Sequence, residues 1–337
     1  MRDRVAPDTP ALVIDDVSKI YLQWQRSGKL KDVLANLIRP RKKTVTALDR
    51  LSLEVRQGEF VAYAGANGAG KSTTIKILSG ILQPTSGTVR VLGLNPAGER
   101  IDLMRRIGVL FGQRSELWWD HPVIVSYEWK KNVWNVPEKA YAENLAVVTE
   151  LLDLSDLLQT FARELSLGQR MRADLGMLLL HSPEVIFLDE PTLGLDVLAK
   201  RQMIRFLRSL NREKGTTIVV TSHDMDDLEE MAERIVLLSA GRILYDGDFD
   251  RLRRVRGGFS RISITASAEP PVLPGMKLLR TEKGVHEYES TDDMPGLQQI
   301  FHELARHGDI VDIEVGKAPI EDVIANLYLE EQDRRKE

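Results

Sequence analysis

One eight-residue stretch, at positions 65–72, constrains the fold of this chain more than any other feature. It reads GANGAGKS and fits the phosphate-binding loop pattern G-x-x-x-x-G-K-[ST]. The apolar run at 59–64 predicts a strand before the loop, and residues 72–78 predict a helix after it. The pattern requires this context, because glycines let the backbone wrap around phosphate oxygens while the helix start presents unpaired N–H groups. We therefore expect an α/β domain that binds a nucleotide.

Individual residues of this loop are expected to bind phosphate or Mg²⁺. Lys71 can reach the β- and γ-phosphates, and Ser72 can ligate Mg²⁺. An ordinary glycine-rich turn is the alternative, but with glycine near 7% of residues a chance match in a chain this long is about one in a hundred. The positions expected to contact the nucleotide are Gly65, Asn67, Gly68, Gly70, Lys71, Ser72 and Thr73.

A second motif places two acids at the end of a buried strand. Residues 185–188 are apolar, and Asp189 and Glu190 follow directly. The strand carries both acids to the carboxyl edge of the sheet, where the phosphate loop also lies. Asp189 would hold Mg²⁺, directly or through water, and Glu190 would act as general base on the attacking water. Acids are common at strand ends without any catalytic role. Because these two follow a phosphate loop by about 120 residues, a role in nucleotide hydrolysis is favoured.

Composition limits the remaining possibilities. The chain has 337 residues, 43% of them apolar and 28% charged, with a formal net charge of −4, so a whole-protein basic field for nucleic acid is absent. It has no cysteine, which excludes disulfides and cysteine metal sites and fits a reducing compartment. The N-terminus does not resemble a signal peptide, and no run approaches 18 apolar residues. Any membrane role is therefore expected to need a partner.

Strand and helix patterns alternate along most of the chain, which favours a parallel sheet covered on both faces. Strands are expected at 11–17, 51–56, 60–64, 88–92, 185–188, 216–221 and 234–239, and helices at 196–213, 224–233 and through most of 121–181. We expect a nucleotide-binding domain over 1–246, with a helical subdomain at about 114–181. A basic insertion at 22–44 contains a short amphipathic pattern; a solvated excursion is favoured over a segment near anionic lipid.

A small α+β domain is expected over 247–337. Alternation at 262–266 predicts a strand, and Lys283-Gly284 between two strand-like runs predicts a hairpin turn. Helices at 295–307 and 319–331 are expected on either side of a strand at 309–315. The domain carries no catalytic motif, so dimer support or regulation is its expected role.

The run at 165–170, LSLGQR, resembles the L-S-G-G-Q signature of ATP-binding cassette (ABC) ATPases. Ser166, Gly168 and Gln169 match, whereas Leu167 replaces a glycine and adds a side chain that must be accommodated. The signature chemistry needs a serine hydroxyl and backbone N–H groups at a helix start, aimed at a γ-phosphate. An ordinary N-capped helix is the alternative, because Ser166 is a good cap.

Further motifs follow the order of that family. Gln113 resembles the Q-loop glutamine, whose amide contacts Mg²⁺ and the attacking water, and Asp196 lies where the D-loop aspartate is expected. His223, directly after a strand, resembles the switch histidine that contacts the γ-phosphate. Tyr21 resembles the aromatic residue that stacks on adenine, with Trp24 as competitor and a core aromatic as the plain alternative.

The resemblance covers residues 11–246 and implies a P-loop NTPase cassette with a mixed or parallel sheet core, a helical subdomain, and ATP and Mg²⁺ as ligands. In this family two cassettes face each other head to tail, so each ATP would lie between Lys71 of one copy and Ser166 and Gly168 of the other. A homodimer or a paralogous heterodimer fits. The implied partners are separate integral-membrane permease subunits at the cytoplasmic face of the cell membrane, with no nucleic acid.

The finer subgroup is less constrained. Residues 247–337, with the runs 111–120 and 165–170, resemble ABC-2 type exporters of the drug-resistance and viologen-exporter kind. An importer ATPase, a cassette acting on ribosomes or DNA, and a nucleotide-gated binding module remain alternatives. Four of the five tryptophans fall at 118–134. They form either a groove for a helix of the membrane subunit or the core of the helical subdomain, and exposure is expected for Trp118 and Trp119.

Overall fold

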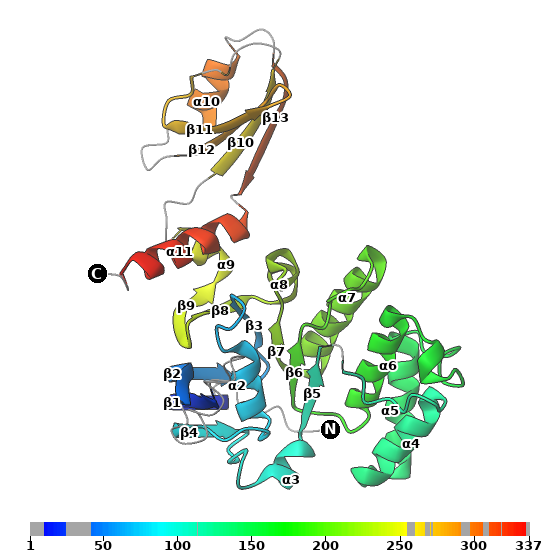
Figure 1. Ribbon diagram of the computed structural model, residues 1–337. Coiled ribbons are helices and arrows are strands. Elements are labelled where there is room, and N and C mark those ends of the chain that lie inside the picture. Colours follow the sequence, from blue (N-terminus) through cyan, green and yellow to red (C-terminus); the bar gives the residue numbers. More distant parts are fainter. Residues whose placement is uncertain are drawn as a thin grey trace, which may run out of the picture. The chain divides into compact units, whose positions relative to one another are not determined.

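The computed structural model describes most of the chain, in two compact units, Met1–Asp246 and Gly247–Glu337 (Figure 1). The described ranges are 10–24, 42–112, 114–254, 260–266, 270, 272–290, 297–305, 310–317 and 319–334. Most of the basic insertion, at 25–41, lies outside them, as does Gln113. The first unit contains two sheets and the second unit contains one.

A six-stranded sheet forms the centre of the first unit. Its strands are β3 (Phe60–Gly65), β5 (Ile107–Phe111), β6 (Val185–Asp189), β7 (Thr217–Thr221), β8 (Arg234–Ser239) and β9 (Arg242–Asp248). Their order is β5-β6-β7-β3-β8-β9, and the pairs from β5 to β8 are parallel. Every residue of β3 and β7 is buried, as expected for strands covered on both faces. The predicted α/β cassette fold is confirmed.

A second, antiparallel sheet packs near the phosphate-binding helix. Its strands are β1 (Pro10–Trp24), β2 (Lys42–Arg56) and β4 (Ser86–Val91), in the order β2-β1-β4. Ile14 and Leu53 from this sheet belong to the same buried cluster as Ile75 and Leu78 of helix α2 (Lys71–Leu78). The cluster fixes the helix that begins at the phosphate loop against both sheets.

Helices cover the sheet and form a separate helical region. They are α3 (Arg100–Met104), α4 (Val123–Val133), α5 (Glu138–Leu151), the 3₁₀ turn η1 (Ala162–Glu164), α6 (Leu167–Leu179), α7 (Val197–Lys214) and α8 (Met225–Met231). Helices α4 and α6 approach closely where the Tyr127 hydroxyl donates to the Ala173 carbonyl at 2.6 Å. A Cβ on Gly176 would lie 2.4 Å from that hydroxyl oxygen, so this contact requires glycine.

The second unit is a small antiparallel sheet with helices. It contains α9 (Phe249–Arg254), β10 (Ser260–Ala266), β11 (Met276–Glu282), β12 (Val285–Ser290), α10 (Leu297–Leu304), β13 (Ile310–Lys317) and α11 (Ile320–Arg334). The strand order is β11-β12-β10-β13. Lys283 and Gly284 both have positive φ, 50° and 81°, which matches the twist of the β11–β12 hairpin. Ile262, Tyr288 and Ile300 belong to its core.

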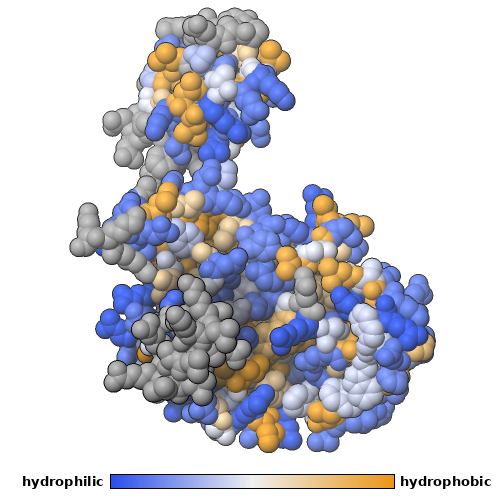
Figure 2. All heavy atoms as spheres, viewed as in Figure 1, coloured by the Kyte–Doolittle hydropathy of each residue, from blue (hydrophilic) through white to orange (hydrophobic). Residues whose placement is uncertain are grey.

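Hydrophilic residues interspersed with smaller hydrophobic patches make up the face of the described structure seen in Figure 2. Within the described ranges, no helix combines the length and apolar character that crossing a bilayer demands.

Candidate nucleotide-binding site

A cavity of about 410 Å³ lies at the carboxyl ends of β3 and β6. Ligands of open α/β sheets bind at this edge, because loops and helix starts meet there. The residues that line the cavity are Tyr21, Val45, Ala47, Asn67, Gly68, Gly70, Lys71, Ser72, Thr73, Gly112, Asp189, Glu190 and Leu193. Residues from the phosphate loop and from the acidic strand end, about 120 positions apart in the chain, therefore share one cavity.

The phosphate loop has a backbone that only glycine can adopt without strain. Gly70 has a φ of 113° and precedes the first residue of α2. A Cβ on Gly70 would lie 2.6 Å from Leu48 Cδ2 and 2.7 Å from the Ala47 carbonyl oxygen. Gly68, with a φ of 80°, faces open space instead. The loop thus packs tightly on the β2 side and is open at Gly68, a cradle that fits a phosphate group.

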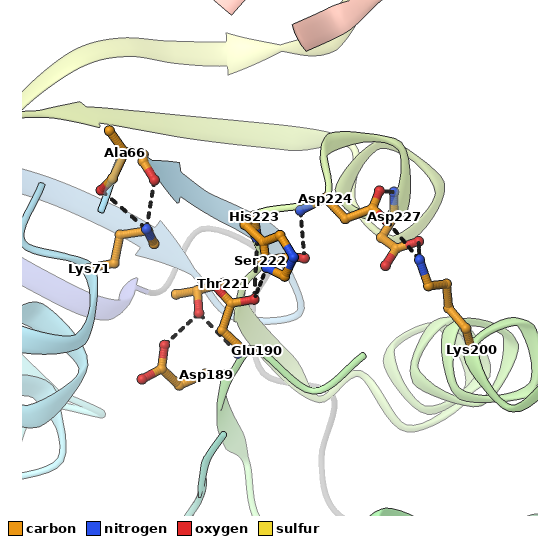
Figure 3. Close-up of polar contacts among 11 residues, drawn as sticks. Ala66, Lys71, Asp189, Glu190, Lys200, Thr221, Ser222, His223, Asp224 and Asp227 are labelled. Atoms are coloured by element: carbon orange, nitrogen blue, oxygen red, sulfur yellow. Dashed lines mark hydrogen bonds and ion pairs between the residues drawn. The ribbon is translucent and has the colours of Figure 1, made fainter. Parts of the chain in front are cut away.

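Lys71 is folded into this loop. Its ammonium donates to the carbonyl of Gly65 at 2.6 Å and to that of Ala66 at 3.4 Å (Figure 3). Only 8% of the residue is exposed, and this burial lowers the pKa of Lys71, while the nearby carboxylates of Glu190 and Asp189 oppose the shift. The lysine is therefore a partly desolvated cation beside two acids, and an anion at the loop would replace its carbonyl contacts.

The two acids at the end of β6 have different partners. Asp189 Oδ1 accepts a 2.6 Å hydrogen bond from the hydroxyl of Thr221. Glu190 Oε2 lies 2.8 Å from His223 Nδ1 and accepts from the His223 backbone N–H at 3.3 Å (Figure 3). Because a carboxylate can only accept, the histidine proton lies on Nδ1. Oxygen donors at Asp189 and Ser72 are of the kind that Mg²⁺ prefers.

The N-cap of helix α8 directly follows His223 and fixes this residue. Asp224 is the N-cap of α8, where its Oδ1 accepts from Asp227 N–H at 3.1 Å. Lys200 of α7 binds Asp224 Oδ2 at 2.7 Å and Asp227 Oδ1 at 3.0 Å, as Figure 3 shows. The histidine therefore stands between a strand end and a tethered helix start, with its side chain toward Glu190.

The signature residues lie apart from the described lining of the cavity. Ser166 and Gln169 form a capping box at the start of α6: Ser166 Oγ accepts from Gln169 N–H at 3.3 Å, and Gln169 Oε1 accepts from Ser166 N–H at 2.9 Å. Leu167 packs beside Gly194, where a Cβ would lie 2.8 Å from Leu167 Cδ2. The extra side chain of Leu167 is thus accommodated by a glycine of the neighbouring loop.

Asp196 is occupied by a local contact. Its Oδ1 accepts from the Ala199 N–H at 2.9 Å as the N-cap of α7. The next two residues, Val197 and Leu198, are 68% and 64% exposed. An exposed apolar pair at a helix start, next to the signature helix, leaves a surface on which another chain can pack.

Other predicted positions have mixed outcomes. Tyr21 lines the cavity, with the Lys19 ammonium 5.4 Å from its ring centroid, whereas the side chain of Trp24 lies outside the described residues. Trp118 and Trp119 are 39% and 53% exposed. Trp118 also packs against Trp129, with ring centroids 5.6 Å apart. The aromatic surface is therefore partly exposed and partly packed upon itself.

Sequence reasoning missed two residues that shape the site. The Gly112 N–H donates to the Asp189 carbonyl at 2.7 Å, and Gly112 lines the cavity. The Thr221 hydroxyl contacts both acids. In the sequence, Thr221 is a hydroxyl residue at the end of an apolar strand, just before Ser222-His223. That position is the only sequence feature that points to a place in the site.

A slightly larger cavity, about 460 Å³, lies at the opposite ends of β3 and β8. Its lining is rich in arginine and glutamate, and Arg234 in this lining is already paired, since it binds both Glu59 and Asp246 at 2.7 Å. Asn211 likewise donates to the Gly58 carbonyl at 2.8 Å. The cavity at the phosphate loop is therefore the better candidate.

Known proteins share this architecture. The family model described as ABC transporter matches residues 48–193. The bacitracin transport ATP-binding protein BcrA of Bacillus licheniformis is 26% identical over 295 residues, which cover 83% of this chain and 92% of BcrA. The methionine import ATP-binding protein MetN of Carboxydothermus hydrogenoformans is 31% identical over 212 residues, 62% of this chain and 63% of MetN. The energy-coupling factor transporter ATP-binding protein EcfA2 of Clostridium perfringens is 32% identical over 206 residues, 60% of this chain and 72% of EcfA2.

The fold also matches a solved structure. The ATP-binding cassette MJ0796, solved as a dimer in a post-hydrolysis state with ADP and Pi, is 24% identical with a TM-score of 0.59. The match covers 70% of this chain and 98% of that protein.

Proposed function

Because this chain belongs to the ATP-binding family of ABC transporters, whose members hydrolyse ATP, we propose that it is the ATPase subunit of an ABC-2 type exporter. The observation that carries the proposal is the convergence of Lys71, Asp189 and Glu190 on one cavity at the carboxyl edge of the sheet. The BcrA alignment covers 83% of this chain, whereas the first unit holds 246 of its 337 residues, so the alignment includes part of the second unit. That length supports a relationship that extends beyond the shared cassette.

In this proposal the loop residues bind and orient the triphosphate. Backbone N–H groups at the start of α2 point to the phosphates, and Lys71 exchanges its contact with the Gly65 carbonyl for phosphate oxygens. Tyr21, at the β2 side of the cavity, stacks on adenine. Mg²⁺ held by Ser72, Gln113 and Asp189 would neutralise charge on the β- and γ-phosphates.

Glu190 and His223 carry the proton and positioning chemistry. Glu190 accepts a proton from the attacking water, and His223 Nδ1–H fixes its carboxylate through the 2.8 Å contact. Glu190 has a φ of 59°, in the left-handed region that costs a non-glycine residue energy. Positive φ also occurs at turn residues such as Lys283, but Glu190 combines it with a place in the lining of the cavity, which supports a functional role.

The signature residues act on a second copy. Ser166, Gly168, Gln169 and Asp196 lie outside the described lining of their own cavity, which supports a role toward the nucleotide of a second copy. The exposed Val197 and Leu198 beside them support such a contact. Shifting a dimer from 1:99 to 99:1 closed needs about 5.5 kcal/mol of differential binding, which two shared nucleotides can supply. A homodimer is the simplest form, and a paralogous heterodimer uses the same geometry.

The partner that receives this work is a permease embedded in the membrane, with the ATPase at its cytoplasmic face. The exposed Trp118 and Trp119, a few residues after Gln113, support docking of a partner helix there. The relatives include both BcrA and an import protein, so an importer remains the main alternative. Purification of the chain from its native membranes and identification of the protein that accompanies it tests the assignment. Recovery with ribosomes instead would contradict it.

The central test is Glu190→Gln. This variant keeps the size and hydrogen-bonding shape of the side chain but cannot accept the proton, so it should bind ATP, release no phosphate and accumulate as a nucleotide-bound dimer. Phosphate release and size-exclusion chromatography with light scattering measure both. Glu213→Gln, an exposed acid at the far end of α7, serves as the matched control. Hydrolysis by the Glu190 variant at the parental rate would exclude Glu190 as the base.

A further inference from the structure

Thr221 is the residue that connects the two acids of the site. It ends strand β7, is fully buried, and pairs with Asp189 in the parallel β6–β7 register. Its hydroxyl donates to Asp189 Oδ1 at 2.6 Å and accepts from the Glu190 backbone N–H at 3.1 Å. The same N–H also lies 3.1 Å from the Thr221 carbonyl oxygen. Figure 3 shows this side chain between the two carboxylates.

We propose that Thr221 is a positioning residue whose single hydroxyl orients Asp189 and Glu190 together. The inference rests on the proposed function, in which these two acids hold Mg²⁺ and activate water. The hydroxyl contacts the carboxylate of Asp189 and the backbone N–H of Glu190, so one group is a shared reference point for both residues.

The hydrogen-bond directions at this hydroxyl are fixed by chemistry. A hydroxyl has one proton to donate and lone pairs to accept with. Because the Asp189 carboxylate can only accept, the proton lies toward Oδ1, and a lone pair is left for the Glu190 N–H. This hydrogen bond holds the Asp189 carboxylate in one orientation, so the position of Oδ2 is fixed as well. A hydrogen bond to a charged acceptor is among the stronger ones in proteins.

Glu190 needs such an anchor because of its backbone. A φ of 59° is disfavoured for a side chain with a Cβ, and it persists only where the surroundings hold it. Two acceptors on Thr221 hold the Glu190 N–H, and His223 holds its carboxylate. Without the hydroxyl, the backbone end of Glu190 keeps one acceptor, and Asp189 Oδ1 loses this donor.

The same strand supplies a matched control. Thr217, at the other end of β7, is 1% exposed, and its hydroxyl accepts from the Gly58 N–H at 2.9 Å, away from the cavity. Thr221→Val and Thr217→Val remove the same group from the same strand at equal burial. Valine keeps the branched shape of threonine, so the strand and its packing are retained. Thr221→Ser restores the hydroxyl without the methyl group.

Two measurements separate positioning from stability. For Thr221→Val we expect kcat to fall about 10- to 100-fold, the range for losing a hydrogen bond to a charged group, with KM changed less. Independently of turnover, a fluorescent ADP analogue should bind Thr221→Val as it binds the parent in EDTA, but gain about 10-fold less affinity on addition of Mg²⁺. Thr221→Ser and Thr217→Val should keep both the parental kcat and the Mg²⁺ effect.

Three results would overturn the proposal. The first is a Thr221→Val variant whose kcat and Mg²⁺ effect equal those of the parent. The second is a loss of the same size in Thr217→Val, because the hydroxyl would then act only through strand stability. The third is a failure of Thr221→Ser to restore the Mg²⁺ effect. If the parent hydrolyses no ATP, the proposed function fails, but the binding comparison still tests Thr221.

Discussion

Replacing Asp174 by asparagine tests the electrostatics of the helical region. Asp174 lies in α6 and is 7% exposed. Its Oδ1 accepts from Ser115 Oγ at 2.9 Å and from Glu116 N–H at 3.0 Å, so it links α6 to the segment after Gln113. Burial raises the pKa of Asp174 from 3.8 to about 6, although the two hydrogen bonds act in the opposite direction. The amide oxygen of an asparagine at this position could accept the same two hydrogen bonds without ever becoming charged.

The sign and size of the effect follow from linkage. A carboxyl group with a raised pKa in the folded state stabilises the fold fully below pH 3.8, and this contribution is lost as pH rises through 6. The shift corresponds to about 3 kcal/mol, of which about 1.4 kcal/mol is lost between pH 5 and pH 8. Asp174→Asn should therefore raise the free energy of unfolding by about 3 kcal/mol at pH 8 and by roughly half of that at pH 5.

Urea unfolding of the full chain at several pH values measures this difference. Tryptophan fluorescence is a suitable probe, because four of the five tryptophans lie at 118–134, in the region that Asp174 joins. Asp227→Asn is the control of opposite sign: Asp227 is also buried but pairs with Lys200 at 3.0 Å, so its loss should destabilise the protein. A stability difference between Asp174→Asn and the parent that does not change from pH 5 to pH 8 would refute the reasoning.

Two further predictions concern the phosphate loop. Lys71→Ala should keep the fold but bind ATP at least about tenfold more weakly, because a charge-assisted contact is removed. Lys76 is exposed on the same helix, so Lys76→Ala should keep the parental ATP affinity. Unchanged ATP affinity in the Lys71 variant would contradict the phosphate role. Gly70→Ala should lower the unfolding temperature and abolish ATP binding, because its Cβ would lie 2.6 Å from Leu48 Cδ2. Gly93 also has a positive φ, 79° against 113° at Gly70, but a Cβ there would meet nothing within 4 Å. Gly93→Ala should therefore lose only about 1 kcal/mol of stability, the backbone cost, in thermal unfolding. Equal losses in the two variants would exclude the clash.

The fold was predictable because its signals are local. The strand–loop–helix context of 59–78 and the acids after 185–188 need only the rule that parallel strands end at one edge, and the structure places both at one cavity. Contacts set by packing were not predictable. No periodicity shows that Tyr127 will face Gly176, that Asp174 will bind Ser115, or that the Thr221 hydroxyl will lie between two acids.

Gln169 illustrates a different limit. Its motif predicts a contact with nucleotide, but the structure also gives its side chain a local partner in the Ser166 backbone N–H. A residue that caps a helix and one that contacts a ligand have the same sequence pattern, so the sequence alone cannot separate these roles. Its contact with nucleotide stays a prediction.

Because Leu167 lies directly beside Gly194, a substitution at either position affects the packing of the other. Restoring the family glycine at 167 would remove the isobutyl group that lies beside Gly194 in the loop ahead of α7. Enlarging residue 194 would collide with the leucine already there. A chain built by copying the common signature into this framework would therefore lose a contact between the start of α6 and the loop ahead of α7.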